Sequence, residues 1–260
     1  MSVLDSIIEG VRLDEQARRL TNSELLERIS SAPAPRSAIE KLASRELSII
    51  AEIKRSSPSK GELSDIPEPA LLAETYEDSG ASVISVLTEQ RRFKGSLKDF
   101  AEVRGAVNLP MLRKDFMVSE YLIQESRAYG ADLVLLIAAA LDDHQLRDFY
   151  ALSQELGMDV LVEIHDEEEL ERVMSISPKI VGVNSRNLKT LEVDITSFDR
   201  LIPLIPGNVI KVAESGISGI EDILMARRTG ADAVLVGEAL VRSQNPGQTL
   251  RSFLESVESS

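Results

Sequence analysis

Residues 49–61 read IIAEIKRSSPSKG, and the rest of the chain is organised around this stretch. Its apolar start predicts a short strand, on which successive side chains alternate between the two faces. Glu52 and Lys54 therefore share one face at the end of that strand. An acid and a base are costly in a core and useful in a site. The plainer alternative is a salt-bridged strand end followed by the polar turn 56–61, which supplies hydroxyls and flexible backbone.

From residue 48 onward, short β-rich runs alternate with amphipathic segments of helical spacing. Eight strands that alternate with eight helices indicate an α/β fold, the (β/α)8 or TIM barrel. A doubly wound sheet is the alternative, and the missing GxGxxG after the first strand weakens it only slightly. The expected strands are 48–54, 82–87, 109–114, 132–137, 159–164, 179–184, 208–214 and 233–237, and the expected helices are 68–79, 97–107, 119–129, 142–156, 166–175, 196–204, 218–229 and 247–257.

Residues 1–47 lack the strand–helix alternation of residues 48–260 and predict an N-terminal helical extension. Apolar residues recur there at near-helical spacing. Thr21 and Glu24 match a capping box at the start of a second helix. We expect a single barrel domain over residues 1–260, of which 1–47 is the extension. The apolar positions are Leu4, Ile7, Ile8, Val11 and Leu13.

The net charge is -14 and the pI is about 4.7, in a chain of 260 residues. An acidic body argues against nucleic acid or an anionic membrane as the main partner, whereas a small anionic substrate fits a locally basic site. Cysteine is absent, which excludes disulfides, thiolate zinc sites and a cysteine nucleophile. The start lacks a signal-peptide pattern, and no apolar run approaches the roughly 20 residues of a membrane span. We therefore expect a cytoplasmic protein.

Polar residues follow nearly every predicted strand, where a barrel of this kind carries its active site. The fourth strand is the exception, because it offers only Leu135 and Ile137. An apolar wall beside many charges suits a substrate with one flat apolar part. The residues at the other strand ends are Glu52 and Lys54; Thr88, Glu89 and Phe93; Lys114, Asp115 and Phe116; Glu163 and His165; Asn184 and Arg186; Glu214, Ser215 and Gly216; Gly237 and Glu238.

Several of these residues have a simpler interpretation. Lys114 could be a surface lysine, but Leu112 shares its face and favours burial in the barrel mouth. Glu163 could start the next helix, although its place after an apolar run favours an inward carboxylate. Asn184 and Arg186 could cap a loop.

The two histidines do not indicate a metal site, because they are not paired in the sequence. His165 lies two residues after Glu163 and so would share its face of the strand, but it lies beyond the apolar run. We expect it to act in the loop or at the helix start rather than in catalysis. His144 lies in a polar helix and is expected to face solvent.

Residues after strands 7 and 8 fit the usual phosphate site of such barrels, where backbone N–H groups and a helix N-terminus receive the anion. They are Ser215, Gly216, Gly237 and Glu238, and Ser57 could add a hydroxyl from the first loop.

Seven ordered motifs within about 48–242 together resemble the indole-3-glycerol phosphate synthase family: IIAEIKRSSPSKG, LTEQRRFKGS, LRKDF, LVEIH, VGVNSRNLKTLEVD, VAESGIS and VLVGEAL. The resemblance implies a (β/α)8 barrel of tryptophan biosynthesis. It implies conversion of 1-(2-carboxyphenylamino)-1-deoxyribulose 5-phosphate into indole-3-glycerol phosphate, CO2 and water, with no metal or organic cofactor.

The same resemblance implies a role for each matching residue. Lys114 corresponds to the general acid and Glu163 to the base, with Glu52, Lys54 and Asn184 as the remaining catalytic groups. Glu214 would line the substrate site, and Arg186 would lie near the substrate carboxylate. An acid at Glu238 beside a phosphate is repulsive, unless its side chain turns outward. The implied phosphate contacts are Ser57, Ser215, Gly216, Gly237 and Glu238, and the implied ring pocket is Phe93, Phe116, Leu135 and Ile137.

Two lysines and several carboxylates are enough for ring closure, decarboxylation and dehydration. We also expect neighbouring lysines in the mouth to depress each other's pKa. Three alternatives remain open: a barrel like phosphoribosylanthranilate isomerase, which relies on a cysteine that this chain lacks; a Schiff-base aldolase using Lys54, Lys114 or Lys211; and a non-catalytic phosphosugar binder. The expected partner is a small phosphorylated molecule. We expect a monomer.

Overall fold

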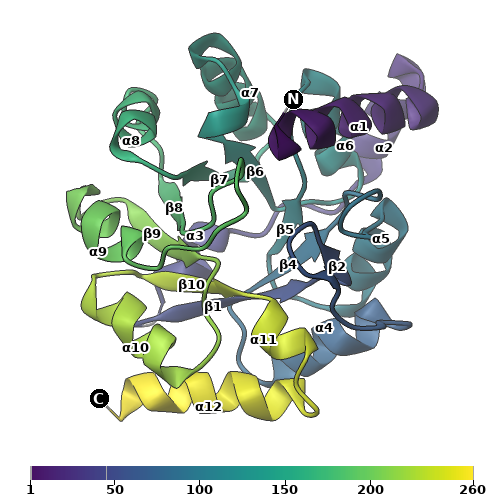
Figure 1. Cartoon of the computed structure of the whole chain (residues 1–260). Coiled ribbons are helices and arrows are strands. Elements are labelled where there is room, and N and C mark those ends of the chain that lie inside the picture. The colour runs from purple at the N-terminus through teal and green to yellow at the C-terminus, as the bar shows by residue number, and fades with distance from the viewer. Residues whose placement is uncertain (1, 45, 260) are drawn as a thin grey trace.

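The computed structural model describes residues 2–44 and 46–259, in which eight parallel strands close into a barrel (Figure 1). The order around the barrel is β1, β10, β9, β8, β7, β6, β5, β4, and β4 pairs with β1. The predicted (β/α)8 fold is therefore confirmed. The strands are β1 (Ser48–Ile53), β4 (Val83–Leu87), β5 (Met111–Lys114), β6 (Leu133–Ile137), β7 (Asp159–Ile164), β8 (Ile180–Asn184), β9 (Ile210–Glu214) and β10 (Ala233–Val236).

Helices form the outer layer in the order that the sequence predicts (Figure 1). The predicted helix 196–204 is divided, because Pro203 lacks an N–H and its segment continues as a 3-10 turn, η2 (Ile202–Leu204). The outer helices are α4 (Pro69–Asp78), α5 (Leu97–Ala106), α6 (Glu120–Ala128), α7 (Asp143–Glu155), α8 (Glu167–Met174), α9 (Ser197–Leu201), α10 (Ile220–Arg228) and α12 (Pro246–Glu258).

Three short elements were not predicted. A hairpin of β2 (Ser56–Ser57) and β3 (Gly61–Glu62) occupies the first loop. The 3-10 turn η1 (Ala138–Ala140) follows β6, and α11 (Glu238–Val241) follows β10. All three lie after the carboxyl ends of barrel strands, where they shape the mouth.

The barrel strands are buried on both faces, because one face fills the interior and the other meets the helices. Every residue of β4, β6 and β8 is buried. Arg113 of β5 is fully buried, and its charge is compensated by Glu125 of α6 at 2.8 Å. Buried charges require such partners.

The N-terminal extension consists of α1 (Val3–Arg18), α2 (Asn22–Ser31) and α3 (Ala38–Leu42). The predicted capping box of Thr21 and Glu24 is present. Arg18 makes a two-bond ion pair with Glu125, at 2.9 and 3.0 Å, and the backbone N–H of Leu20 donates to the Tyr121 hydroxyl. These contacts fix α1 beside α6 at the barrel rim (Figure 1).

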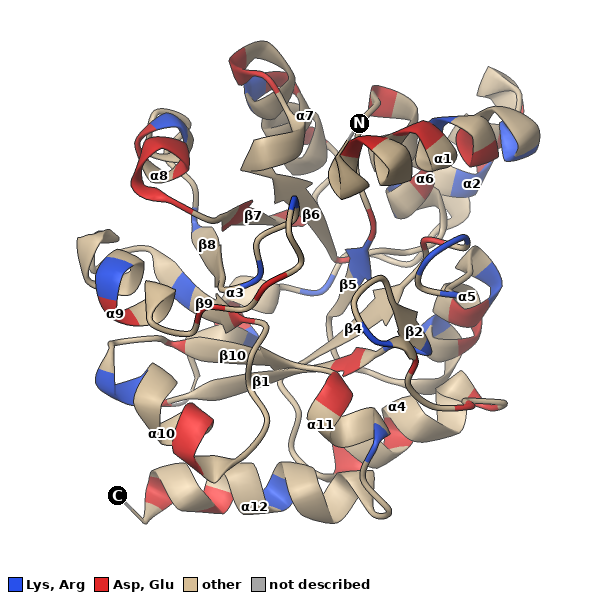
Figure 2. Cartoon of the chain, viewed as in Figure 1, with Lys and Arg blue, Asp and Glu red and all other residues tan. Residues whose placement is uncertain are grey.

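Acidic and basic residues are interspersed over the outer helices rather than gathered by sign (Figure 2). The excess of acid is therefore spread over the body. Among the described residues, no helix has the length and apolar character needed to cross a membrane.

Candidate active site

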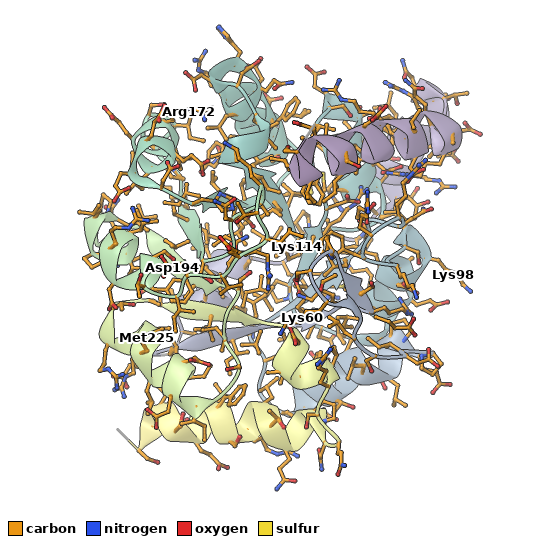
Figure 3. The ribbon with its side chains drawn as sticks, viewed as in Figure 1. Lys60, Lys98, Lys114, Arg172, Asp194 and Met225 are labelled. Atoms are coloured by element: carbon orange, nitrogen blue, oxygen red, sulfur yellow. The ribbon has the colours of Figure 1, made fainter. Side chains whose placement is uncertain are left out.

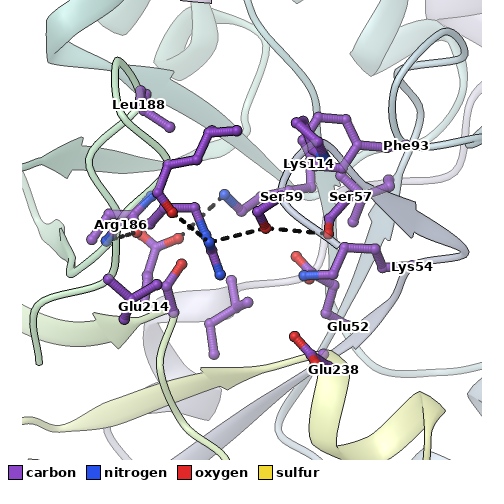
Figure 4. A pocket seen from close by; sticks show the side chains of 18 of the residues that line it. Glu52, Lys54, Ser57, Ser59, Phe93, Lys114, Arg186, Leu188, Glu214 and Glu238 are labelled. Atoms are coloured by element: carbon purple, nitrogen blue, oxygen red, sulfur yellow. Dashed lines mark hydrogen bonds and ion pairs between the residues drawn. The ribbon is translucent and has the colours of Figure 1, made fainter. Parts of the chain in front are cut away.

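A cavity of about 640 Å³ opens at the carboxyl ends of the barrel strands. All sixteen residues that the sequence analysis assigned to the site line it (Figure 4). The carboxyl ends of all eight strands meet at this rim, so motifs far apart in the sequence converge there. These residues are Glu52, Lys54, Ser57, Phe93, Lys114, Phe116, Leu135, Ile137, Glu163, Asn184, Arg186, Glu214, Ser215, Gly216, Gly237 and Glu238.

Lys114, the last residue of β5, lies at the centre of the barrel, whereas Lys98 projects from its edge (Figure 3). Its Nζ atom is 3.1 Å from Glu163 Oε2 and 3.3 Å from Glu214 Oε2. Burial lowers the pKa of Lys114, but Glu163, Glu214 and Glu52 outweigh it and raise the pKa above its ordinary value. The expectation that the lysines depress each other's pKa is therefore wrong for Lys114, because the surrounding carboxylates dominate.

The pKa values of two carboxylates beside Lys114 are shifted in opposite directions. Burial raises the pKa of Glu163, but Lys114, His165 and a hydrogen bond from Asn184 outweigh it and lower the pKa. The Asn184 amide donates to Glu163 Oε1 at 3.0 Å. Burial and the charge of Glu163 raise the pKa of Glu214 to about 8, although Lys114 opposes the shift. Such divergent pairs can divide acid and base roles between them.

Glu52 and Lys54 form an ion pair of 2.5 Å at the end of β1. The salt-bridged strand end considered from the sequence is thus present, and it also lines the cavity. In the barrel order, β1 and β7 are four strands apart in either direction. Glu163 therefore lies across the mouth from this pair.

An apolar wall covers one side of the cavity. The rings of Phe93 and Phe116 are 6.3 Å apart, with Leu135 and Ile137 from β6 nearby in the lining. The Glu89 carboxylate accepts the Phe93 backbone N–H at 2.9 Å, which fixes the loop that presents the ring.

The extension also contributes to this cavity, through Leu4 and Ile7 of α1. Sequence reasoning placed both residues on the apolar face of a helix, but it did not assign them to the site. Periodicity reveals which face is apolar, whereas the docking position depends on contacts such as Arg18 with Glu125.

The opposite side of the cavity is lined by the residues after β9 and β10, namely Ser215, Gly216 and Gly237. Ser215 and Gly216 adopt positive φ of 66° and 77°. A Cβ at Gly216 would lie 2.5 Å from Ile195 Cγ2, so only glycine fits there. A Cβ at Gly237 would lie 2.4 Å from Glu52 Oε1, so a larger residue there would displace the Glu52 side chain.

Glu238 does not turn outward, because it lines the cavity and pairs with Lys60 of the first loop at 2.8 Å. Arg186 donates to the Ser59 hydroxyl at 3.0 Å, which joins the loop after β8 to the same first loop (Figure 4). Lys60 and Ser59, which the sequence analysis did not assign, thus connect two sides of the mouth.

Asp115 also lines the cavity, whereas Lys211, His144 and His165 lie outside its lining. Lys211 is near the start of β9, where its Nζ is 3.7 Å from Asp232, and it cannot act in the mouth. His144 is exposed on α7, as expected. His165 contacts Glu169 at the start of α8, as expected, but its ring also faces Glu163.

The barrel and its mouth define the class of this protein: a (β/α)8 barrel whose cavity combines an acid–base centre, an apolar wall and glycine-containing turns after β9 and β10. The chain belongs to the indole-3-glycerol phosphate synthase family, whose model matches residues 4–253. It is 55% identical to the indole-3-glycerol phosphate synthase of Paenarthrobacter aurescens (strain TC1), over 97% of this chain and 96% of that protein. It is 54% identical to that of Mycolicibacterium smegmatis (strain ATCC 700084 / mc(2)155), over 94% and 91%.

Solved structures of other proteins share the fold. A 3-hexulose-6-phosphate synthase from Salmonella typhimurium superposes with a TM-score of 0.66 at 15% identity, covering 82% of this chain and 99% of that one. A thiamine phosphate pyrophosphorylase from Pyrococcus furiosus gives 0.63 at 14% identity, covering 86% and 98%. At this identity the likeness concerns the barrel alone.

Proposed function

We propose that this chain is an indole-3-glycerol phosphate synthase, a carboxy-lyase that converts 1-(2-carboxyphenylamino)-1-deoxyribulose 5-phosphate into indole-3-glycerol phosphate, CO2 and water. The observation that carries the proposal is the place of Lys114. Its ammonium lies within 3.3 Å of two buried carboxylates, in a cavity that has an apolar wall on one side and the glycine-containing turns after β9 and β10 on the other.

Substrate binding uses the two sides of the cavity differently. Phe93 and Phe116 pack against the aromatic ring, since flat apolar surfaces favour such contacts. Backbone N–H groups at Ser215, Gly216 and Gly237 receive the phosphate, because N–H groups at such turns and helix starts attract anions. Arg186 faces the substrate carboxylate. The reacting atoms then lie between the two sides, next to Lys114.

Ring closure is the first step. The ring carbon that carries the carboxylate attacks the ketone carbon, and a C–C bond forms while the C=O π bond breaks. Lys114 donates a proton to the ketone oxygen, which becomes a hydroxyl. Its charge is retained over the neutral range because its pKa is raised, so the donor is always present.

Decarboxylation and dehydration follow. The C–CO2 bond breaks, and its electron pair restores the aromatic ring. The new hydroxyl then leaves as water after accepting a proton from Lys54, whose partner is Glu52. Glu163 takes the proton from the carbon next to nitrogen, and that C–H electron pair completes the indole double bond. Asn184 holds Glu163 through the amide hydrogen bond of 3.0 Å.

The test is a turnover assay in which indole emission and released CO2 are measured together. The chain contains no Trp, so indole emission stands above a low protein background. We expect one CO2 for each indole product. Binding of the substrate without either signal would contradict the proposal and favour a phosphosugar-binding protein. We infer that the protein acts in the cytoplasm. We also infer that it is a monomer, and analytical ultracentrifugation tests this oligomeric state.

A further inference from the structure

The His165 ring lies between two carboxylates, behind the wall of the cavity. Its Nδ1 is 3.0 Å from Glu169 Oε2, and its Nε2 is 3.4 Å from Glu163 Oε1. Nε2 is buried, and apart from this contact it has no hydrogen-bond partner among the described residues. His165 does not line the cavity, so it meets the reacting groups only through Glu163.

Both carboxylates act as acceptors, which constrains the ring. Glu169 Oε2 also accepts the His165 backbone N–H at 2.8 Å, and Glu163 accepts from Asn184 and Lys114. A neutral imidazole carries one N–H and could donate to only one of its two neighbours. An imidazolium donates to both. The arrangement therefore favours a ring that is protonated on both nitrogens.

A purely local role does not explain the ring. Glu169 is already held at the start of α8 by the His165 backbone N–H and, through its own N–H, by Asp166. Neither of these bonds needs an imidazole. The ring adds one contact that no helix cap requires, the approach of Nε2 to Glu163.

We propose that His165, held by Glu169, is a positioning residue for Glu163: its imidazolium holds carboxylate Oε1 and keeps Glu163 ionised and oriented for its proton transfer. This inference rests on the proposed function. Lys114 from β5 holds the other oxygen, Oε2, and Asn184 from β8 shares Oε1.

The charges around the pair agree with this role. The charged or titratable groups that face Glu163 are Lys114, Glu214 from β9 and His165, and those that face His165 are Glu163 and Glu169. Burial lowers the pKa of His165, but its two carboxylate neighbours outweigh burial and raise the pKa to about 10. His165 is therefore charged across the neutral range.

The first test measures the ring directly and needs no substrate. The chain has two histidines, and exposed His144 is an internal reference. In ¹⁵N-detected histidine spectra at pH 8, His165 should be protonated on both nitrogens, whereas a histidine with the reference pKa of about 6.5 is neutral at that pH. Glu163→Gln should lower the titration midpoint of His165. A neutral His165 ring at pH 8 would overturn the inference.

The second test is kinetic. His165→Gln keeps an amide donor near the Nε2 position but removes the charge. We expect kcat to fall by roughly 10-fold to 100-fold, the scale of a misplaced catalytic group. The acid limb of the kcat profile should move to higher pH, because Glu163 becomes easier to protonate. KM should stay within about twofold, and His144→Gln should behave as wild type.

If His165→Gln does not fold, as judged by circular dichroism, Glu169→Gln serves instead, because it keeps the local cap and removes the anion. An unchanged kcat and acid limb in the folded variant would overturn the inference. The outcomes separate the two proposals. A wild-type protein that forms no indole contradicts the proposed function, whereas an active protein with a neutral His165 contradicts only this inference.

Discussion

At the scale of single residues, the charges around Lys114 determine which side chains of the site are ionised. Three carboxylates, Glu52, Glu163 and Glu214, influence one largely buried ammonium, that of Lys114. The pKa of Glu163 is lowered and that of Glu214 is raised, although they are the same residue type. Environment, rather than residue type, therefore assigns the roles.

The first prediction concerns Glu163. Glu163→Gln keeps the size and hydrogen-bonding reach of the side chain but removes the base. In a single turnover with enzyme in excess, CO2 release should continue while indole absorbance lags behind it, because dehydration needs a base across the mouth from the Glu52–Lys54 pair. Wild type should give the two signals closer together. Equal loss of both signals, with substrate recovered unchanged, would place Glu163 at or before ring closure.

The second prediction concerns Glu238, a carboxylate in the proposed phosphate cradle. Glu238→Gln removes its charge and frees Lys60, its partner at 2.8 Å. Inorganic phosphate should then compete with substrate roughly twofold to fivefold more strongly, the scale of one partly exposed charge. Lys60→Gln should act in the opposite direction. This pair is a cleaner probe than a Gly237 variant, whose Cβ would press on Glu52. A phosphate inhibition constant that does not change in either variant would argue against this cradle.

The sequence predicted most of the site residues but not their ionisation or their partners. Strand-end positions, the loops after them and the family motifs led to the sixteen assigned residues, all of which line the cavity. Within a strand, a period of two fixes which side chains face inward. The ionisation of Lys114 was mispredicted, since its pKa depends on distances to acids from three other strands. Glu169 and Lys60 were missed for the same reason: their partners are known only from the fold.

At the scale of elements, the first loop and α1 complete the mouth. The hairpin β2–β3 reaches across through Lys60 with Glu238 and Ser59 with Arg186. These are partly exposed polar contacts, each of which stabilises the loop only slightly. We therefore expect this loop to have low local stability, as segments that admit substrate do.

The third prediction concerns the mobility of this loop. Residues 56–61 should exchange amide hydrogens quickly in the empty protein and more slowly with bound phosphate or product, because ligand contacts would add to the two polar contacts. Hydrogen exchange with mass spectrometry measures this, with β6 as the buried control. Equal protection with and without ligand would mean that the loop is not a lid.

Element boundaries were predicted well where the pattern is long and regular. The β7 and α5 segments match within one residue, whereas 196–204 is interrupted by Pro203. The hairpin β2–β3 and the four-residue α11 went unseen, because so few residues carry no periodic pattern. The docking of α1 depends on Arg18 and Glu125, which are 107 positions apart in sequence.

At the scale of the whole molecule, the chain has a net charge of -14, and its mouth brings acidic and basic side chains together. Buried charges at the mouth make the free energy of unfolding depend on pH.

The fourth prediction concerns Glu214, whose pKa is raised from 4.5 to about 8. The folded state holds this proton while the unfolded state loses it, so the free energy of unfolding should fall as pH rises between these values. Glu214→Gln should flatten that decline in urea unfolding. A decline of equal slope in both proteins would contradict the shifted pKa.

The central claim is that Lys114 closes the indole ring in this cavity, and Lys114→Ala tests it most directly. Removing the ammonium leaves buried carboxylates without their partner, so the fold is first verified by circular dichroism. In the folded variant, indole formation should fall by roughly 10²–10⁴, the range for a positioned acid. Competition by inorganic phosphate, measured on the residual activity, should persist because its cradle lies on other strands. Near-normal turnover in Lys114→Ala would contradict the account.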